Sequence, residues 1–402
     1  MYDLIIIGGG MAAMAAAIEA GKNNKKILLI DRNDKLGRKL YATGNGRCNI
    51  TNENIDYRSC YNSDNNNYFT FLEKSLGEGP YEGVMDFLDN VGIKTKSING
   101  YVYPMSLQAS AFVWTLIDKL KEYGVEVLLK TEIIDITKEN GIFTVKSDNA
   151  SYEASKVLFA CGGRSYSRLG GTESGYRLAE SLGHTITKLR PALCGLQANK
   201  IDGRLAGVRA GCRVFLCDER NNIIASEEGE LQLNQNVLSG IVIFNLSSIA
   251  GKLMDKGTPL YVMIDFIPGF TEEEIKNQLI KNQNRTVLAA TNTLVNDRLA
   301  TAILEDMSID RRTKTGELSG KDLDGIIGRL KGYRVDIDGV KDYETAQVTA
   351  GGVDISEINY DFSSKKTEGL FLAGEMLDID GLCGGYNITF AILSGIKAGQ
   401  SI

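Results

Sequence analysis

The chain has 402 residues, of which 43% are hydrophobic and 24% charged, a composition typical of a globular protein with two or three lobes. A formal net charge of −6 excludes a protein that binds nucleic acid through its overall charge. One histidine (His184) and seven cysteines without a CxxC pair exclude the usual zinc sites, so we expect no metal.

No apolar run reaches the roughly 18–20 residues needed to cross a bilayer. The first residues carry neither the positive charge nor the small-residue cleavage site of a signal peptide. The odd number of cysteines indicates reduced thiols rather than a disulfide framework. We therefore expect a cytoplasmic protein with no membrane partner.

The chain begins with the pattern of a β-α-β unit. Residues 2–7 and 26–31 are apolar and predict two buried strands, and the alanine-rich residues 11–21 predict a helix between them. Two strands joined by one helix imply a parallel sheet.

Three small residues and one acid of this unit occupy positions where the residue type has a structural reason. Gly8 lets the chain turn off the first strand, and Gly10 lets the backbone approach a pyrophosphate at the helix N-terminus. Ala13 lets the helix pack closely on the strand, and Asp31 can accept hydrogen bonds from an adenosine ribose. The pattern predicts a dinucleotide-binding fold without distinguishing NAD from FAD.

The next segment, residues 37–52, predicts a polar loop. It contains three glycines, three cations and several amide and hydroxyl groups. Such a loop suits the pyrophosphate and ribitol of FAD.

Along the rest of the chain the expected type of secondary structure changes twice. Single elements are expected as a helix at 110–124 and strands at 125–129, 132–137, 141–146, 156–160 and 369–373. Short alternating strands dominate from 191 to 268, and a helical stretch follows from 271 to 330. We divide the chain into a nucleotide-binding domain in two parts (1–190 and 344–402), an inserted β-rich domain (191–270) and an inserted helical segment (271–343).

Near the end, Glu375 follows a buried strand, where an acid suits a ribitol hydroxyl. The apolar helix expected at 388–398 comes directly after Gly384-Gly385-Tyr386-Asn387. Its N-terminus would direct N–H groups toward the flavin N1 and C2=O, where negative charge develops on reduction.

Four blocks of the chain together resemble the BaiN/RdsA family of NAD(P)/FAD-dependent oxidoreductases, whose relatives are also classed as aminoacetone oxidases. The blocks are residues 5–31, 37–52, 157–190 and 346–399. The most distinctive stretches are Val348-Thr349-Ala350-Gly351-Gly352-Val353 and Gly384-Gly385-Tyr386-Asn387.

The resemblance implies an α/β fold: a glutathione-reductase-type FAD-binding Rossmann domain with an inserted β-rich plus helical substrate domain. It implies FAD as cofactor and NAD(P)H as a transient donor. The residues implied to bind the cofactor are Gly8, Gly10, Met11, Ala13, Asp31, Arg32, Arg38, Lys39, Gly44, Gly46, Arg47, Asn49, Ile133, Ala160, Gly162, Gly374, Glu375, Gly385, Asn387 and Ile388.

Two departures from the family pattern concern the substrate. Similar proteins usually show Phe-Thr-x-x-Gly-x-Ser-Gly where this chain has residues 233–240, without the threonine and first glycine. They usually show Leu-Gln-Trp where this chain has Ile388-Thr389-Phe390. Substrate identity therefore does not transfer from the resemblance.

The expected function is hydride transfer between flavin N5 and a C=C, C=N or C–N bond of a small molecule. The alternatives are a reductase of uracil in ribosomal RNA, a non-catalytic redox-sensing flavoprotein, and a dehydrogenase that binds NAD directly. RNA stays open because two stretches are cationic: residues 190–215 have five cations against one acid, and residues 311–334 have seven against three.

A reductase also needs a proton donor, and a lone histidine at a helix end is a poor candidate. We predict Cys48 as the acid, because Arg47 beside it can tune its pKa. Cys383 and Tyr386 are the other candidates, and a buried thiol present only for packing is the alternative for Cys48.

Overall fold

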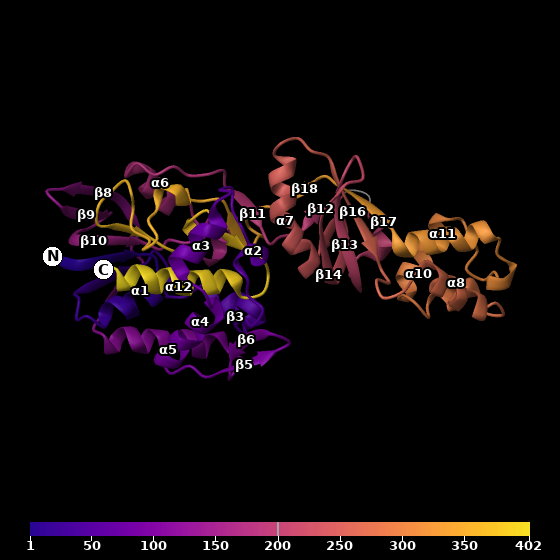
Figure 1. The fold of residues 1–402 in the computed structure, drawn as a ribbon, viewed down its shortest axis with the longest axis horizontal. Coiled ribbons are helices and arrows are strands. Elements are labelled where there is room, and N and C mark those ends of the chain that lie inside the picture. The colour runs from indigo at the N-terminus through magenta and orange to yellow at the C-terminus, as the bar shows by residue number, and fades with distance from the viewer. Residues whose placement is uncertain (199–200) are drawn as a thin grey trace. The chain divides into compact units, whose positions relative to one another are not determined.

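The computed structural model describes residues 1–198 and 201–402 (Figure 1). Its contacts divide the chain into two compact units. Unit 1 comprises residues 1–190 and 347–402, and unit 2 comprises residues 191–346. Unit 1 is therefore built from both ends of the sequence.

A seven-stranded sheet forms the centre of unit 1. Four strands run parallel in the order β7-β2-β1-β10, and β20 pairs with β10 on the side away from β1. The antiparallel strands β9 and β8 extend the sheet from the first half of β10. The strands are β1 (Tyr2–Ile7), β2 (Ile27–Ile30), β7 (Glu126–Leu128), β8 (Ile133–Glu139), β9 (Ile142–Ser147), β10 (Ser151–Phe159) and β20 (Leu370–Leu372).

Helix α1 (Met11–Gly21) packs on β1 and β2 of this sheet, and helix α12 (Tyr386–Gln400) packs along α1. Every residue of α1 is buried, which explains its alanine-rich sequence. A Cβ on Gly395 of α12 would lie 2.3 Å from the carbonyl oxygen of Ala12. The two helices approach this closely because Gly395 and Gly399 of α12 lie against Ala12 and Ala16 of α1. Figure 1 shows α12 in yellow.

Shorter elements complete unit 1. The helices are α2 (Tyr57–Cys60), α3 (Tyr68–Leu76), α4 (Pro80–Asn90), α5 (Ala109–Glu122) and α6 (Ser174–Ser181), with 3-10 turns η1 (Leu40–Gly46), η2 (Ser167–Leu169), η5 (Ile355–Glu357) and η6 (Gly374–Met376). The small strands are β3 (Thr51–Asn52), β4 (Tyr61–Asn62), β5 (Thr95–Ile98), β6 (Tyr101–Pro104), β19 (Val348–Ala350) and β21 (Asp380–Gly381).

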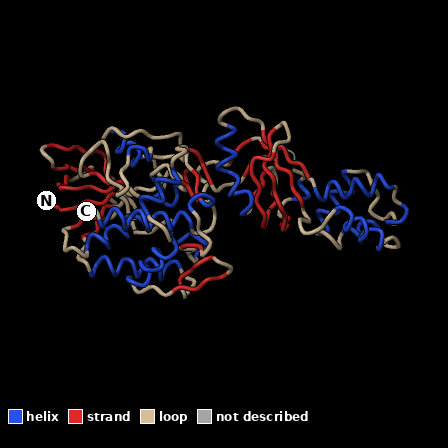
Figure 2. Tube along the Cα trace, viewed as in Figure 1, coloured by secondary structure: helices blue, strands red, loops and turns tan. Residues whose placement is uncertain are grey.

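Unit 2 contains an antiparallel sheet in the order β17-β16-β13-β14-β15-β12-β18. Figure 2 shows its strands in red and the helices in blue. Its strands are β12 (Leu196–Gln197), β13 (Val208–Asp218), β14 (Ile223–Asn234), β15 (Val237–Ser239), β16 (Leu260–Asp265), β17 (Tyr333–Ile337) and β18 (Gly339–Val340), and β11 (Arg190–Ala192) precedes them. The helices are α7 (Ile241–Met254), α8 (Glu272–Lys281), α9 (Val287–Thr291), α10 (Asp297–Asp306) and α11 (Gly320–Lys331), with η3 (Gly203–Leu205) and η4 (Thr315–Glu317).

The predicted α/β fold and its opening β-α-β unit are confirmed, since β1 pairs with β2 in parallel around α1. Short strands dominate residues 191–268 as expected, but helix α7 interrupts them and was not anticipated. The run Ile241-Val242-Ile243 favours a strand by local propensity, but packing against β14 makes it part of a helix. No helix among the described residues is long and apolar enough to cross a membrane.

Candidate active site

The ends of four parallel strands bring distant parts of the sequence to one edge of the sheet. β1, β2, β10 and β20 run in the same direction, so the residues that follow them lie along their shared carboxyl edge. These residues are Gly8, Asp31, the segment Ala160–Gly163 and the pair Gly374-Glu375. In open α/β sheets this edge is where ligands bind.

Two glycines of the first turn differ in what surrounds them. Gly8 has φ +111°, and a Cβ there would lie 2.2 Å from the carbonyl oxygen of Ala160. A Cβ on Gly10 would meet no atom within 4 Å, and its φ of −81° suits any residue. Gly10 precedes α1, whose first turn has no side-chain cap, so no capping side chain competes with an anion for its N–H groups. Met11 and Ala13 are buried in that helix.

Asp31 lies at the end of β2, and its side chain is almost wholly buried. Its Oδ1 accepts a hydrogen bond from the backbone N–H of Asn33 at 2.6 Å, and its carbonyl accepts one from Thr131. Ile133, the buried first residue of β8, follows two residues later. The ribose and adenine positions expected from the sequence therefore adjoin each other.

The neighbouring cations are also fixed. Arg38 donates from Nη1 to Asn33 Oδ1 at 3.0 Å. The exposed Arg32 pairs with Glu132 at 3.6 Å. Both guanidinium groups therefore stay beside the loop that follows β2.

An ion pair joins two predicted site residues that are 336 positions apart. Lys39 Nζ lies 3.0 Å from Glu375 Oε2, and Glu375 Oε1 accepts a hydrogen bond from the Thr349 backbone N–H at 3.1 Å. A Cβ on Gly163 would lie 2.6 Å from both Glu375 Oε1 and Thr349 Oγ1, so only glycine fits there. Gly162 (φ +71°) lies alongside. Thr349 and Gly163 were missed as site residues, although both belong to blocks that carried the resemblance.

The loop after Lys39 turns sharply at η1. Gly44 (φ +55°), Gly46 (φ +82°) and Arg47 are exposed. Asn49 Oδ1, in contrast, is buried without a hydrogen-bond partner among the described residues. An orphaned buried acceptor is unfavourable unless a ligand supplies a donor, as a ribitol hydroxyl can. This atom and the open space at Gly10 both fit a dinucleotide cofactor.

The position of Cys48 argues against its predicted role as the acid. Its side chain has no exposed surface. Burial raises the pKa of the thiol to about 12, and the Thr43 hydrogen bond opposes this only in part. A side chain that is enclosed by protein does not reach a substrate, so packing explains Cys48 better.

The turn before α12 is held by its own side chains. Asn387 Oδ1 accepts from the Gly381 N–H at 2.8 Å, and Nδ2 donates to the Gly381 carbonyl at 2.7 Å. The amide of Asn387 therefore positions the turn, and its contribution to a cofactor would come from the backbone N–H. Gly385 (φ +93°) caps the helix so close to Thr51 that a Cβ would lie 2.8 Å from the Thr51 Cα.

Tyr386 and Ile388 are half-buried in the first turn of α12. Tyr61 fixes the backbone there, because its hydroxyl donates to the Tyr386 carbonyl at 2.8 Å and the two rings lie 6.3 Å apart. The backbone that carries the Tyr386 phenol is therefore held in place at the edge of the predicted site.

His184 lies elsewhere, in an arrangement that superficially matches a catalytic triad. Its Nε2 lies 2.8 Å from Ser364 Oγ, and its Nδ1 lies 3.2 Å from Glu357 Oε2. Ser364 Oγ, however, already accepts the backbone N–H groups of Lys366 and Thr367. With both lone pairs occupied the serine is a poor nucleophile. Burial holds the pKa of His184 below its ordinary value, so the ring is a neutral structural link.

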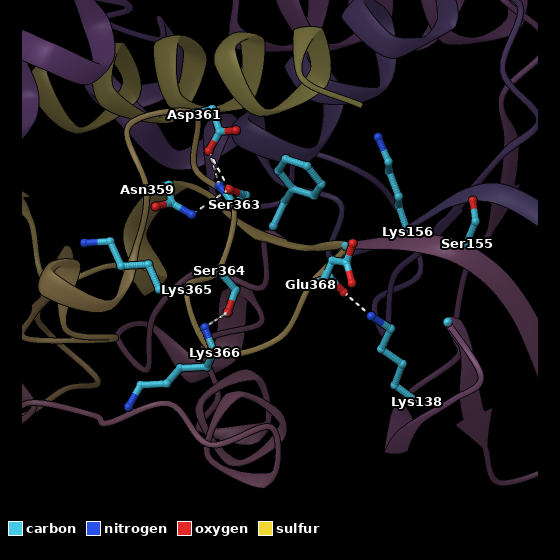
Figure 3. Close-up of a pocket in the computed structure, with 13 residues that line it drawn as sticks. Lys138, Ser155, Lys156, Asn359, Asp361, Ser363, Ser364, Lys365, Lys366 and Glu368 are labelled. Atoms are coloured by element: carbon cyan, nitrogen blue, oxygen red, sulfur yellow. Dashed lines mark hydrogen bonds between the residues drawn. The ribbon is translucent and has the colours of Figure 1, made fainter.

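The cavity in Figure 3, of about 850 Å³, does not coincide with the predicted site. It lies near the middle of β10 and the beginning of β20, beside Ser155, Lys156 and Gly369, and it contains none of the predicted site residues. Lys138 reaches the carbonyl of Glu368, and the labelled lysines in Figure 3 diverge rather than converge on one point. We do not assign it to the active site.

Comparison with known proteins places the chain among flavoenzymes. Residues 2–401 match the model of the HI0933-like protein Rossmann domain family. The chain is 31% identical over 409 residues to a 3-dehydro-bile acid delta(4,6)-reductase from Clostridium scindens, covering 100% of this chain and 99% of the relative. It is 28% identical to a ribosomal RNA dihydrouridine synthase from Escherichia coli, covering 100% and 98%.

A solved structure shows the same fold. A 3-ketosteroid delta1-dehydrogenase from Sterolibacterium denitrificans superposes with a TM-score of 0.52 at 13% identity, covering 100% of this chain and 99% of that one. The family match over almost the whole chain, together with a relative more than 30% identical along its full length, settles the assignment. This chain belongs to the HI0933-like family and is an FAD-dependent oxidoreductase.

Proposed function

We propose that this enzyme reduces a carbon–carbon double bond conjugated with a carbonyl group in a small cyclic molecule, with NAD(P)H as the source of electrons. The proposal is supported by the reactions of two relatives, a bile acid reductase and a dihydrouridine synthase. A 3-dehydro delta(4,6) bile acid has double bonds conjugated with a ketone, and dihydrouridine is uridine saturated at a bond conjugated with a ring carbonyl. The two substrates differ in size and charge, but the bond reduced is of one type.

The residues at the carboxyl edge suit FAD. Gly10 and the uncapped start of α1 would hold the diphosphate, Asp31 the ribose, and Glu375 with Asn49 the ribitol. When bound, FAD supplies hydride chemistry at its ring N5. The Lys39–Glu375 pair would keep the carboxylate in place while it accepts hydrogen bonds.

We assign Tyr386 as the proton donor for the carbon that does not receive hydride. Conjugate reduction adds hydride to the β-carbon and leaves the α-carbon to be protonated. His184 is held by Ser364 and Glu357, and Cys48 is fully buried. Tyr386 is half-buried on the turn predicted to meet the flavin, and it carries an acidic hydroxyl.

The charge distribution favours a small molecule over RNA. Eight cations of the two cationic stretches form ion pairs: Arg190, Arg204, Arg209, Arg213, Arg312, Arg329, Lys331 and Arg334. Lys200 lies outside the described residues. A carboxylate beside each guanidinium weakens the positive potential that RNA phosphates require.

Anaerobic reduction followed by re-oxidation tests the proposal. The purified protein should show a flavin band near about 450 nm that NADPH or NADH bleaches without oxygen. A cyclic enone, such as a 3-oxo-delta4 steroid acid, should then restore the band. Re-oxidation by uridine-containing RNA alone would favour the second relative's substrate. Re-oxidation by oxygen but by no organic acceptor would favour a redox sensor.

Replacing the proposed acid gives a sharper test. Tyr386→Phe should keep bound FAD and its reduction by NAD(P)H but slow re-oxidation by the enone about 10²–10⁴-fold. Cys48→Ala is the matched control and should re-oxidise at nearly the wild-type rate. The opposite ranking of these variants in stopped-flow traces would return the role to Cys48.

A further inference from the structure

We propose that residues 163–172 form a strap that crosses the end of β1 and, by contact between Gly170 and Asn33, closes over the diphosphate of bound FAD. The proposal depends on FAD binding by this family and not on the substrate class proposed above. It assigns a cofactor-retaining role to residues that the sequence patterns left without one.

The strand order requires the strap to cross the first turn. β1 lies between β2 and β10 in the sheet. Asn33 follows β2, and residues 163–172 follow β10. A contact between these two segments therefore spans the end of β1, where Gly8–Gly10 begin the turn into α1.

The contact is close and depends on glycine. A Cβ on Gly170 would lie 2.5 Å from Asn33 Nδ2, and Gly170 has φ +102°. Its partner is rigidly held, because Asn33 donates its N–H to Asp31, accepts from Lys130 N at its carbonyl and accepts from Arg38 at Oδ1. A larger residue at position 170 would push the two sides apart.

The strap itself is preformed. Thr172 N donates to the Gly163 carbonyl at 3.2 Å and closes its base, and Gly171 N donates to the Tyr166 carbonyl at 3.1 Å. A Cβ on Gly171 would lie 2.0 Å from the Ser165 carbonyl oxygen, so the loop folds tightly on itself. Such a loop moves as one body, and its contact with Asn33 becomes the point of opening.

The charges around the strap suit a diphosphate. Arg38 is bonded to Asn33 at the contact, and the exposed Arg168 lies two residues before Gly170. Arg164, at the base, pairs with Glu173 at 2.7 Å. Guanidinium groups and the N–H groups of the first turn of α1 are the donors that phosphates prefer. FAD held there leaves only after Asn33 and Gly170 separate.

The rate at which FAD leaves the holoenzyme measures this contact directly. Gly170→Ala should speed FAD dissociation about tenfold or more, followed by flavin fluorescence after dilution. Gly183→Ala is the matched control, because Gly183 also has positive φ (+88°) but a Cβ there meets no atom within 4 Å. It should leave the dissociation rate unchanged. Equal rates in the two variants would overturn the strap.

A second variant keeps the test valid if Gly170→Ala folds poorly. Asn33→Ala should also speed FAD release, and combining it with Gly170→Ala should add little, because both act on one contact. FAD should also slow tryptic cleavage after Arg168 in the wild-type enzyme. Strictly additive effects, or cleavage at Arg168 that ignores FAD, would overturn the proposal. A wild-type protein without flavin would instead overturn FAD binding itself.

Discussion

Gly8 and Gly10 belong to one turn, yet they are required for different partners. Gly8 is enclosed by the backbone of Ala160, whereas Gly10 faces open space. Packing within the fold requires a glycine at position 8 but not at position 10, which fits the proposed cofactor-binding role of Gly10. A substitution at Gly8 should therefore impair folding, whereas one at Gly10 should impair cofactor binding.

We therefore predict that Gly10→Val yields a folded protein without flavin. The Cβ would meet no protein atom within 4 Å, so the free energy of unfolding should change by less than about 0.5 kcal/mol. Absorbance of the purified protein gives the FAD content, and urea denaturation of the apoprotein gives the stability. Gly8→Ala should instead fail to fold. Stoichiometric FAD in Gly10→Val would refute the assignment of this turn.

Asp378 is a buried carboxyl group next to the site and makes stability depend on pH. It has no exposed surface, and both of its oxygens accept from the Asp64 N–H at 3.1 and 3.3 Å. Burial raises its pKa from 3.8 to about 6, with the Asp64 charge adding and the Asp64 N–H opposing. Because the folded pKa exceeds the unfolded one, this stability is present below pH 3.8 and is lost as pH rises through about 6.

Asp378→Asn stays neutral and should avoid that loss. The free energy of unfolding of Asp378→Asn, relative to that of the wild type, should therefore increase from pH 4 to pH 7.5. The increase is at most about 3 kcal/mol for a pKa shift of roughly two units. The weaker acceptor of asparagine will reduce the gain. Urea denaturation at both pH values measures it, and a stability difference independent of pH would contradict the prediction.

The surroundings of two predicted site residues could not be read from the sequence, for a tertiary reason. The sequence shows that Cys48 and Asn387 lie in the right loops. It does not show that Cys48 points into the core or that Gly381 takes both ends of the Asn387 amide. The positions of Gly8, Gly10 and Asp31 in the fold were predictable because they depend on strand–turn–helix order, which is local.

At the scale of elements, the α1–α12 contact fixes how tightly unit 1 can close. Small side chains on both helices bring Gly395 against the Ala12 backbone, where no side chain can move aside. An added methyl group must therefore displace a whole helix. This contact links the turn at Gly10 to the turn at Gly385 through rigid bodies.

We predict that Gly395→Ala destabilises unit 1 by about 3 kcal/mol, the upper part of the range for overpacking. Gly328→Ala in α11 is the matched helical control, because its Cβ meets no atom within 4 Å. It should stabilise unit 2 by about 0.5–1 kcal/mol. Hydrogen exchange resolves the two units separately. Similar effects of the two substitutions would contradict this account of the helix contact.

The elements that could be predicted are those with a local signal. The strand at 2–7 and the helix at 11–21 show clear apolar runs between glycines, and the structure has them there. Helix α7 has β-branched residues at its start and is apolar on most sides, so its sequence alone does not distinguish a strand from a buried helix. Packing against β14 favours the helix over a strand, and the local sequence pattern does not reveal that contact.

At the scale of the molecule, composition and structure disagree about charge. The two cationic stretches look like RNA-binding surfaces in sequence, but most of their described cations face carboxylates. Most of these acids, such as Glu228 and Asp306, lie just outside the two stretches in sequence. Counting charge within a window misses them.

Accordingly, we expect a uridine-rich single-stranded RNA to bind only weakly, with a Kd no tighter than about 10⁻⁶ M at physiological salt. Fluorescence anisotropy at several salt concentrations checks this. Arg311 and Lys314 form no ion pair among the described residues, so Arg311→Gln with Lys314→Gln is the relevant variant. Tight binding that this variant weakens by about two units of salt slope would restore RNA as the substrate.

The split of unit 1 between the two ends of the sequence sets the timing of cofactor loading during synthesis. When residue 190 leaves the ribosome, the N-terminal sheet lacks β20, Glu375 and helix α12. The intervening residues 191–346 take between roughly 8 and 30 s to translate at ordinary rates. During that interval Glu375, the ion-pair partner of Lys39, and Gly395, which packs on Ala12, have not yet been synthesised. We therefore expect the nascent chain to acquire FAD only as its final helix folds, and a message truncated before that helix to yield a colourless protein.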